Sequence, residues 1–559
     1  MYNNMNRKYL RIAFAAMAAP FLLASCSQED TLGGDRLPEG AYPLEIASVT
    51  MEVEGSEQPW STKAAQTRVA ENADRSGSVW QTGDVFYVKF EGSDKVGKYK
   101  ITDAGTGAVE SVESVYWQSA SQEQSIIAWY APQQEGTIDV SNQKSALTYV
   151  MRAEQKATYN SSSNAVSLTF SHQLAKVRVY LRGTAYEGNA TGVTLSYPAS
   201  YTVKEGKVTK ASDANGTIQM HKAENANYYE ALVLPGTIET NGNPFTVALG
   251  SNNQEVNLSA PMTLAASSKN DVTLKLHKSG TKEIDLSDKD YEIGDNGIYY
   301  VYGKASHGIK VTGGSPDIYL EDADFDVADN SAISVSDNAN PTIHLIGTNN
   351  TINTSSPSDI LKGYAGIYVA ENGSVTITAD NPQSRLILIA SNGGAGIGGN
   401  RNGNTSFTNS GEITIKHVTV YTYGHPTAEG GVSAGIGCAG NGSCKTITID
   451  NATIHAFGGG SISTFAPAIG AGIGPDLVTT SSLPQVIIKN STIYAHRGGG
   501  NADYIGWSSS INGQGGGTGA ILPGTGSIIN STVHCYTGNQ EETIDKTVVY
   551  DANGVGTGE

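Results

Sequence analysis

Cys26 is the position at which the neighbouring residue types define a specific covalent reaction. Before it stand three positive charges, an apolar run over residues 12–23, and the small pair Ala24-Ser25. Signal peptidase II accepts small residues ahead of a cysteine whose thiol carries diacylglycerol, so residues 1–25 are predicted to be a lipoprotein signal peptide and Cys26 the acylated first residue of the mature chain. The alternative is an ordinary secretory signal or a membrane anchor, but about twelve apolar residues are fewer than the roughly 20 that span a bilayer.

The four residues after Cys26 are Ser-Gln-Glu-Asp. They resemble the acidic export signal that directs Bacteroidetes lipoproteins to the outer leaflet. Buried acyl chains contribute about 0.8 kcal/mol per CH₂, so a multiply acylated cysteine anchors stably. We therefore expect an outer-membrane lipoprotein at the cell surface, with the membrane as a partner through the lipid on Cys26.

Cys438 and Cys444 flank a flexible Ala-Gly-Asn-Gly-Ser segment. In an oxidising compartment this spacing suits a small disulfide loop, although it leaves open whether the bond forms. No CxxC pair, HExxH motif or His/Cys cluster occurs, so neither a structural metal nor a cofactor is expected.

Glu321, Asp322, Asp324 and Asp326 form the one dense acidic cluster of the repeats. They suit either a Ca²⁺ site or a solvated acidic edge, and we favour the edge. Polysaccharide lyases and glycosidases need paired carboxylates, or a base with a cation that neutralises the substrate. In the best-aligned repeats Asp450 is an isolated acid, so we expect no catalytic residues and no enzyme.

A short pattern recurs along the chain after residue 297. Residues 413–421 align with 447–455 and 486–494, and a fourth copy ends at Val533-His534. Glycine-rich stretches such as residues 394–399 separate the copies, and no helical segment follows them as it would in a nucleotide-binding loop. Repeats of this length indicate a solenoid, so residues 297–559 are predicted to form a right-handed parallel β-helix. A third sandwich with glycine-rich loops is the alternative.

Eight rings recur at two positions of this alignment. Because the apolar residue before each first ring points inward, the rings should point outward. Their faces could stack on sugars, which makes them candidate ligand-binding residues; alternatively they only stabilise neighbouring strands, by about 0.2–1 kcal/mol per pair. The first column is Tyr421, His455, Tyr494 and His534, and the second is Tyr423, Phe457, His496 and Tyr536.

The chain before residue 279 contains short β-rich runs separated by Gly, Ser, Asn and Asp, which is typical of β-sandwiches. We expect a flexible tether over residues 26–43, sandwiches over 44–150 and 151–278, and a polar linker over 279–296. The class is therefore all-β.

Three motifs in this part carry a family resemblance: Trp-Gln-Thr-Gly-Asp at residues 80–84, Leu-Thr-Phe-Ser-His-Gln-Leu-Ala-Lys-Val at 168–177, and Ala-Leu-Val-Leu-Pro at 231–235. Together they resemble the fimbrillin family of Bacteroidetes surface lipoproteins. The resemblance implies two transthyretin-like β-sandwich domains and assembly with other fimbrial subunits by strand addition.

The resemblance also implies that an arginine-specific protease removes the first strand, here residues 47–53. Arg68 is the best candidate for the cleavage site, with Lys63 and Arg75 as rivals. Family stalk subunits also donate a C-terminal strand, whereas this chain continues into a long repeat region. That departure favours a tip or accessory subunit.

The net charge of the chain limits the classes of binding partner. The formal net charge of −18 becomes −21 once the three positive charges of the signal peptide are removed, which argues against nucleic acid. We therefore expect a cell-surface adhesin that binds a host or microbial glycan, or a surface protein, through the repeats. The alternatives are a glycan-binding lipoprotein that does not polymerise and, less favoured, a β-helix polysaccharide lyase or hydrolase.

Overall fold

The computed structural model describes residues 36–51, 70–71, 78–162, 165–185, 190–223, 228–240, 242–250, 252–354, 358–359, 361–379, 381, 383–403, 406–425, 433–438, 442–460, 466–471, 485–498, 504–507, 510–511, 514–515, 521, 526–537 and 544–558. Every regular element in this part of the chain is a β-strand, which confirms the all-β class. Among these residues no helix is long and apolar enough to cross a membrane. The chain divides into two compact units.

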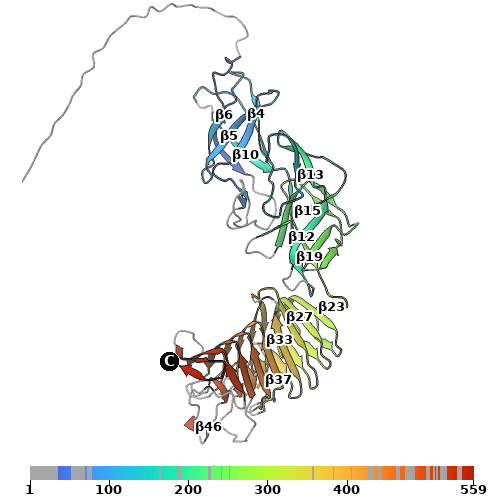
Figure 1. Ribbon diagram of the computed structural model, residues 1–559, viewed down its shortest axis with the longest axis vertical. Coiled ribbons are helices and arrows are strands. Elements are labelled where there is room, and N and C mark those ends of the chain that lie inside the picture. The colour runs from blue at the N-terminus through green and yellow to red at the C-terminus, as the bar shows by residue number, and fades with distance from the viewer. Residues whose placement is uncertain are drawn as a thin grey trace, which may run out of the picture. The chain divides into compact units, whose positions relative to one another are not determined.

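The first unit combines residues up to Thr50 with Trp80–Trp129 and Ala153–Phe170. Its centre is packed with aromatic rings, since the ring centroid of Phe170 lies 5.0 Å from that of Trp80 and 5.4 Å from that of Phe86. Two of the three sequence motifs therefore meet in this core. The unit is built on a seven-stranded sheet in the order β1 (Glu45–Met51), β10 (Ala165–His172), β9 (Met151–Ala157), β7 (Gln124–Tyr130), β4 (Val85–Phe90), β5 (Gly97–Asp103) and β6 (Ala108–Glu113) (Figure 1).

Strand β1 lies at the edge of this sheet, beside β10. The hydroxyl pairs Ser48–Ser167 and Thr50–Thr169, at 3.1 and 3.2 Å, advance in the same direction along both strands, which indicates parallel pairing. Before β1, Arg36 and Pro43 form antiparallel bridges to Ser119 and Tyr116. Residues 36–43, which we expected in a flexible tether, are thus paired within the first unit. Glycine and proline mark turns in this stretch, but they do not prevent the pairing.

The second unit begins with several small sheets, which we call the middle region (β8 and β11–β22). Strand β8 lies here beside β13, whereas β9 and β10 join the first sheet, so the division is not the simple cut at residue 150 that strand spacing suggested. The sheets are β16 (His221–Lys222), β17 (Tyr228–Val233), β11 (Ala175–Arg182) and β22 (Lys269–Lys275); β15 (Gly216–Gln219), β12 (Ala190–Tyr197), β19 (Phe245–Leu249) and β20 (Asn252–Val256); β14 (Lys207–Lys210), β13 (Ser200–Lys204) and β8 (Gly136–Asp139); and β18 (Gly236–Ile238) with β21 (Met262–Leu264). A separate pair is β2 (Ala70–Glu71) with β3 (Ser78–Val79).

Residues 281–558, which we call the repeat region, form a stack of coils whose strands pair in parallel up to β49 (Figure 1). The larger sheet contains β23 (Thr281–Glu283), β25 (Ile298–Ala305), β27 (Asp317–Asp326), β29 (Thr342–Ile346), β30 (Asn350–Asn353), β33 (Ser374–Ala379), β34 (Arg385–Ile389), β37 (Glu412–Lys416), β38 (Thr419–Tyr423), β40 (Thr446–Asp450), β41 (Thr453–Phe457), β43 (Gln485–Lys489), β44 (Thr492–Arg497), β48 (Ser527–Ile529), β49 (Ser531–Thr537), β50 (Ile544–Tyr550) and β51 (Gly556–Gly558). The smaller sheet contains β24 (Tyr291–Ile293), β26 (Ile309–Val311), β28 (Ile333–Val335), β32 (Ile367–Val369), β35 (Ile397–Gly398), β39 (Ile436–Cys438), β42 (Ile469–Ala471) and β45 (Ile505–Trp507). Two short antiparallel pairs are β31 (Lys362–Gly363) with β36 (Arg401–Asn402) and β46 (Ser510–Ile511) with β47 (Gln514–Gly515).

The register of the stack is the one that the repeat alignment predicted. Ile413 pairs with Ile447, and Ile447 pairs with Val486. Along the next column, Val420 pairs with Ile454 and Ile454 with Ile493. These side chains are at most 1% exposed, so like residues stack into one continuous apolar core.

Tight stacking explains the glycine-rich motifs between copies. Gly398 and Gly437 have φ values of +133° and +128°, which side-chain-bearing residues rarely adopt. A Cβ on Gly398 would lie 1.7 Å from the Gly437 carbonyl oxygen, and one on Gly437 would lie 2.0 Å from that of Gly470. The motifs are therefore places of close backbone approach, as expected, and not phosphate-binding loops.

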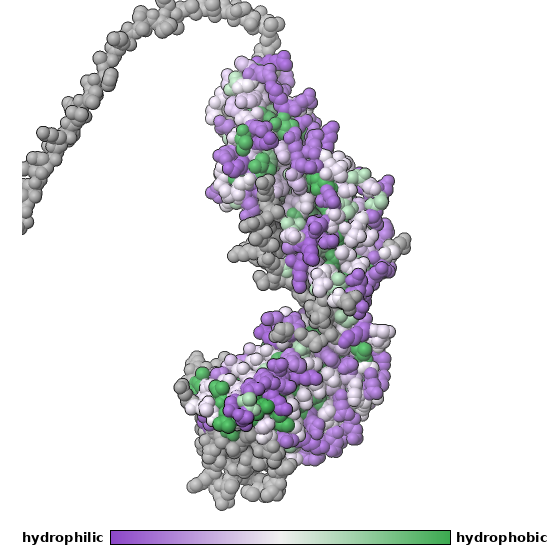
Figure 2. All heavy atoms as spheres, in the orientation of Figure 1, coloured by the Kyte–Doolittle hydropathy of each residue, from purple (hydrophilic) through white to green (hydrophobic). Residues whose placement is uncertain are grey.

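The stack ends in an antiparallel hairpin. Strand β50 pairs with β49 and β51 with β50. Ile544, Val549 and Val555 are 51%, 49% and 60% exposed in this part of the chain. Figure 2 shows apolar side chains gathered at this end of the repeat region.

Candidate functional site

The first ring column is assembled as the alignment predicted. Ring centroids lie 4.2 Å apart between Tyr421 and His455, 4.2 Å between His455 and Tyr494, and 4.9 Å between Tyr494 and His534. The planes are nearly parallel, with angles of 12°, 3° and 24°. These four side chains are half-buried, so their outer edges reach solvent.

The second column stacks in the same way but is largely covered. Tyr423, Phe457, His496 and Tyr536 are separated by 4.3, 4.1 and 4.3 Å. Phe457, His496 and Tyr536 are only 4%, 0% and 5% exposed. We expected both columns on an outer face, and for these three rings that expectation is wrong. The alternation along a strand gives the direction of a side chain, but it does not reveal what packs over it.

Stacking also limits what the first column offers a ligand. Parallel strands lie about 4.8 Å apart, so rings at equal register cover each other's faces. At the two ends of the column, Tyr421 pairs in register with Ile387 and His534 with Thr547, whose hydroxyl lies 3.0 Å from His534 Nδ1. The column therefore presents ring edges, with the polar atoms of Tyr and His, and not the open ring faces that the sequence suggested.

The acidic cluster is built into local hydrogen bonds. Asp324 accepts a hydrogen bond from the Thr351 hydroxyl, and Asp326 accepts one from Asn353 Nδ2 at 3.3 Å. Among the described residues, no group of three or more His, Cys, Asp or Glu side chains is placed to hold a metal ion. The two exposed aspartates thus form a satisfied edge, and the structure offers no support for a Ca²⁺ site.

Glu321, also in that cluster, differs from its neighbours because it is only 2% exposed. It accepts hydrogen bonds from the Gly183 amide at 2.8 Å and from the Tyr300 hydroxyl at 2.7 Å, and Arg182 Nη1 lies 3.7 Å away. Burial raises the pKa of the Glu321 carboxyl, against the hydrogen bonds and Arg182, which lower it. Sequence reasoning missed this role because Gly183 is far away in the chain.

The cysteines have different environments. Cys438 and Cys444 are joined by a disulfide bond and are both buried. Cys535 is a buried free thiol whose pKa burial raises to about 12. Cys26, Arg68 and its rivals Lys63 and Arg75 lie outside the described residues, so their roles remain predictions.

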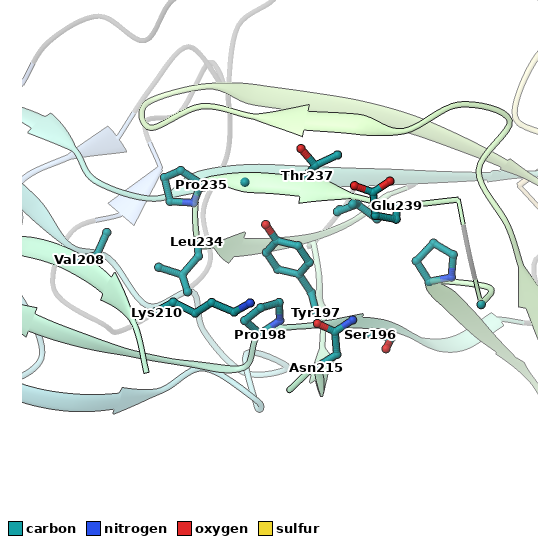
Figure 3. Close-up of a pocket in the computed structure, with 14 residues that line it drawn as sticks. Ser196, Tyr197, Pro198, Val208, Lys210, Asn215, Leu234, Pro235, Thr237 and Glu239 are labelled. Carbon is teal, nitrogen blue, oxygen red and sulfur yellow. The ribbon is translucent and has the colours of Figure 1, made fainter. Parts of the chain in front are cut away.

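A cavity in the middle region was not foreseen from the sequence. It has a volume of about 460 Å³, and Figure 3 shows the Tyr197 ring at its centre. Tyr197, at the end of β12, is 6% exposed, and burial raises the pKa of its phenol. The cavity is lined by Ser196, Tyr197, Pro198, Val208, Lys210, Asn215, Leu234, Pro235, Gly236, Thr237, Ile238, Glu239, Gly242 and Pro244.

No local sequence motif predicted this cavity, because its lining comes from chain segments that are separate in the sequence. Prolines at positions 198, 235 and 244 each adjoin a strand end, and this recurrence was the signal available in the sequence. Gly236 leaves room for the phenol, since a Cβ there would lie 2.5 Å from the Tyr197 hydroxyl.

Comparison with known proteins finds a family that resembles the part of the chain before the repeat region. Residues 67–290 match a family model described as fimbrillin-like. This segment is similar to the fimbrillin-like family. The match confirms the resemblance carried by the three motifs. It ends at residue 290, just after β23, so it leaves the rest of the repeat region uncovered.

The solved structures that resemble this chain are distant from it in sequence. A putative cell adhesion protein from Bacteroides uniformis is 19% identical, with 36% of this chain and 88% of that chain covered and a TM-score of 0.30. A tip fimbrial protein from Porphyromonas gingivalis is 11% identical, with 32% and 77% covered and a TM-score of 0.22. A putative adhesin from Bacteroides thetaiotaomicron is 8% identical, with 35% and 84% covered and a TM-score of 0.24. No curated protein matches the chain.

Proposed function

We propose that this protein is a cell-surface fimbrial adhesin, a tip or accessory subunit, in which two transthyretin-like β-sandwiches carry a right-handed parallel β-helix. The fimbrillin-like match over residues 67–290 is the observation that carries the proposal. The parallel, in-register pairing of the repeat region supports its second half. No catalytic step is assigned.

Attachment to the outer membrane runs through lipid on Cys26. The support is the residue pattern around this cysteine, in which a short apolar run ends in small residues. The acidic residues that follow favour export to the surface.

Assembly proceeds by exchange of the first strand. Cleavage after Arg68 would release β1, which lies at a sheet edge and buries Ile46 and Val49 to 8% and 2% exposure. Burying one such side chain is worth about 1.5–3 kcal/mol, so the vacated edge favours a replacement strand with apolar residues at matching positions.

Loss of β1 would also leave polar groups that a new strand must satisfy. The buried Tyr99 hydroxyl donates to the Leu44 carbonyl at 2.8 Å, and the Val49 amide donates to the Gly107 carbonyl at 3.0 Å. An unsatisfied buried group costs about 1–3 kcal/mol. Backbone pairing with another subunit supplies these partners, which is the physical basis of strand addition.

N-terminal sequencing of protein recovered from the cell surface tests the proposal. A mature chain that begins at Val69 is expected. A start at Ala64 or Ser76 would move the cleavage to Lys63 or Arg75. If every surface fraction still begins at acylated Cys26, the subunit mechanism is wrong, and the protein is an anchored binding lipoprotein that does not polymerise.

The exposed edges of the first ring column, together with the neighbouring threonines, are the proposed contact surface of the repeat region. Tyr421 and Tyr494 alternate with His455 and His534, so phenol and imidazole edges recur along one line. Such a row offers hydrogen-bonding groups at a regular spacing to a host or microbial glycan or to a surface protein.

A further inference from the structure

The phenol of Tyr197 is a polar group that faces the middle-region cavity. The side chain is 6% exposed and lines the cavity. No described residue exchanges a hydrogen bond with its hydroxyl, and burial alone raises its pKa. The hydroxyl lies beside the cavity, so a group that enters the cavity can exchange a hydrogen bond with it.

The remaining walls supply two kinds of contact. Pro198, Pro235 and Pro244, together with Leu234, provide flat apolar surface. A cavity of about 460 Å³ lies within the range of roughly 300–1,000 Å³ that small-molecule sites occupy. The space therefore suits a compact ligand with both apolar faces and hydrogen-bonding groups.

The charges at the cavity favour no ionic ligand. Lys210 and Glu239 both line it, and Figure 3 draws them on either side of the Tyr197 ring. Lys210 Nζ also lies 3.3 Å from Asp213 Oδ1, so its charge is partly balanced already. An anion would gain from Lys210 and lose near Glu239, and a cation the reverse, whereas hydroxyl groups form hydrogen bonds with both.

We propose that this cavity is a binding site for a neutral saccharide of one or two sugar units, with Tyr197 as its central hydrogen-bonding residue. The prolines pack against the C–H faces of the sugar. Asn215 and Thr237 offer further polar groups at the wall. This site is separate from the ring columns, and its occupation does not depend on fibre assembly.

The test uses the full-length chain with Cys26→Ala, so that it is not lipidated, and saturation-transfer NMR with isothermal titration. The probes are glucose, galactose, mannose, N-acetylglucosamine, maltose and lactose, with glucuronic acid and glucosamine as charged counterparts. At least one neutral sugar is expected to bind. Tyr197→Phe, which removes only the hydroxyl, should weaken that binding on the order of fivefold, because a hydrogen bond contributes about 1 kcal/mol.

Tyr201→Phe is the matched control. Its phenol is fully buried on β13 and does not line the cavity, so the same change should leave sugar affinity unaltered. The double change Tyr421→Phe/Tyr494→Phe separates the two surfaces, because it alters the ring-column edges only. The proposal is overturned if none of the neutral sugars binds, if only the charged sugars bind, or if Tyr197→Phe binds as well as the unaltered chain. None of these outcomes would affect the N-terminal sequencing result.

Discussion

Two polar side chains of this protein are buried in a way that the sequence did not predict. Glu321 and Tyr197 are 2% and 6% exposed, and neither stood out from the sequence as a buried group. Glu321 is held by an amide and a phenol from other parts of the chain, whereas Tyr197 faces a cavity. The two residues therefore differ in what their removal should change: stability in one case and ligand binding in the other.

Glu321 predicts a pH dependence of stability. Burial raises the pKa of its carboxyl in the folded state above the ordinary value of 4.5, so the folded state binds this proton more tightly than the unfolded state. The stability contributed by the group is thus complete below that ordinary pKa and is lost as pH rises through the folded-state pKa. Glu321→Gln mimics the protonated acid and should flatten this fall, as measured by thermal unfolding across mildly acidic to mildly alkaline pH.

Glu283→Gln is the control of opposite sign. A hydrogen bond from Lys275 is the largest cause that lowers the pKa of Glu283, so its stabilising contribution is present above the ordinary pKa and lost as pH falls through the folded-state pKa. This variant should lose stability at neutral pH and not at acidic pH. Parallel pH profiles for the unaltered chain and Glu321→Gln would contradict the assignment.

At the scale of strands, register was predictable and burial was not. The pairing of Tyr421 with His455 and of His455 with Tyr494 was predictable because these residues occupy equivalent positions in successive sequence repeats. The covering of Phe457 and His496 depends on packing over the strand, which no alignment of repeats contains. The same limit applies to the cavity, because Tyr197, Lys210 and Glu239 come from separate strands and turns.

The ring column predicts a graded loss of stability. Tyr494 stacks on both His455 and His534, whereas Tyr421 stacks on His455. Aromatic pairs contribute about 0.5–1.5 kcal/mol each, so Tyr494→Ser should cost about 1–3 kcal/mol and Tyr421→Ser about half as much. Chemical denaturation monitored by circular dichroism measures both. Equal losses for the two variants would argue against stacking as the cause.

The conservative change separates stacking from binding. Tyr421→Phe/Tyr494→Phe keeps the rings and removes their outward hydroxyls, so it should leave the unfolding midpoint unchanged. If the column edges contact a glycan or surface protein as proposed, the same variant should weaken attachment on a glycan array or to host cells. Unchanged attachment would leave the column with a structural role alone.

For the whole molecule, the segment from Cys26 to Arg68 contains both the proposed membrane anchor and strand β1 of the first unit. Arg36, Pro43 and β1 pair within the first unit, so nine residues, 27–35, separate Cys26 from this paired segment. Cleavage after Arg68 would therefore separate the anchor and β1 from the rest of the chain in one step. Anchoring and strand exchange are then alternatives for any one molecule.

Replacement of Cys26 by Ala should release the protein from the membrane. The acyl chains supply the membrane affinity, and the described residues contain no membrane-spanning helix. Metabolic labelling with a fatty-acid analogue, followed by fractionation, should find unlabelled Cys26→Ala protein outside the membrane fraction. Cys535→Ala, which removes a buried thiol, should keep both label and location. Label in the Cys26→Ala protein would refute the anchor.

Strand exchange predicts that the cleaved chain accepts a peptide in place of β1. A synthetic peptide of residues 41–51 should bind chain cut after Arg68 and raise its unfolding midpoint, because it restores the burial of Ile46 and Val49 and the acceptor for Tyr99. Val49→Asp in the peptide places a charge at a position that is 2% exposed, so binding should fall at least about tenfold. Thr50→Asp is the matched control, since Thr50 is exposed and its hydroxyl meets Thr169 at the surface. Isothermal titration compares the three peptides. Equal binding of the Val49→Asp and Thr50→Asp peptides would show that binding at the vacated edge does not depend on the buried side chains of the strand. Subunit assembly would then need another interface.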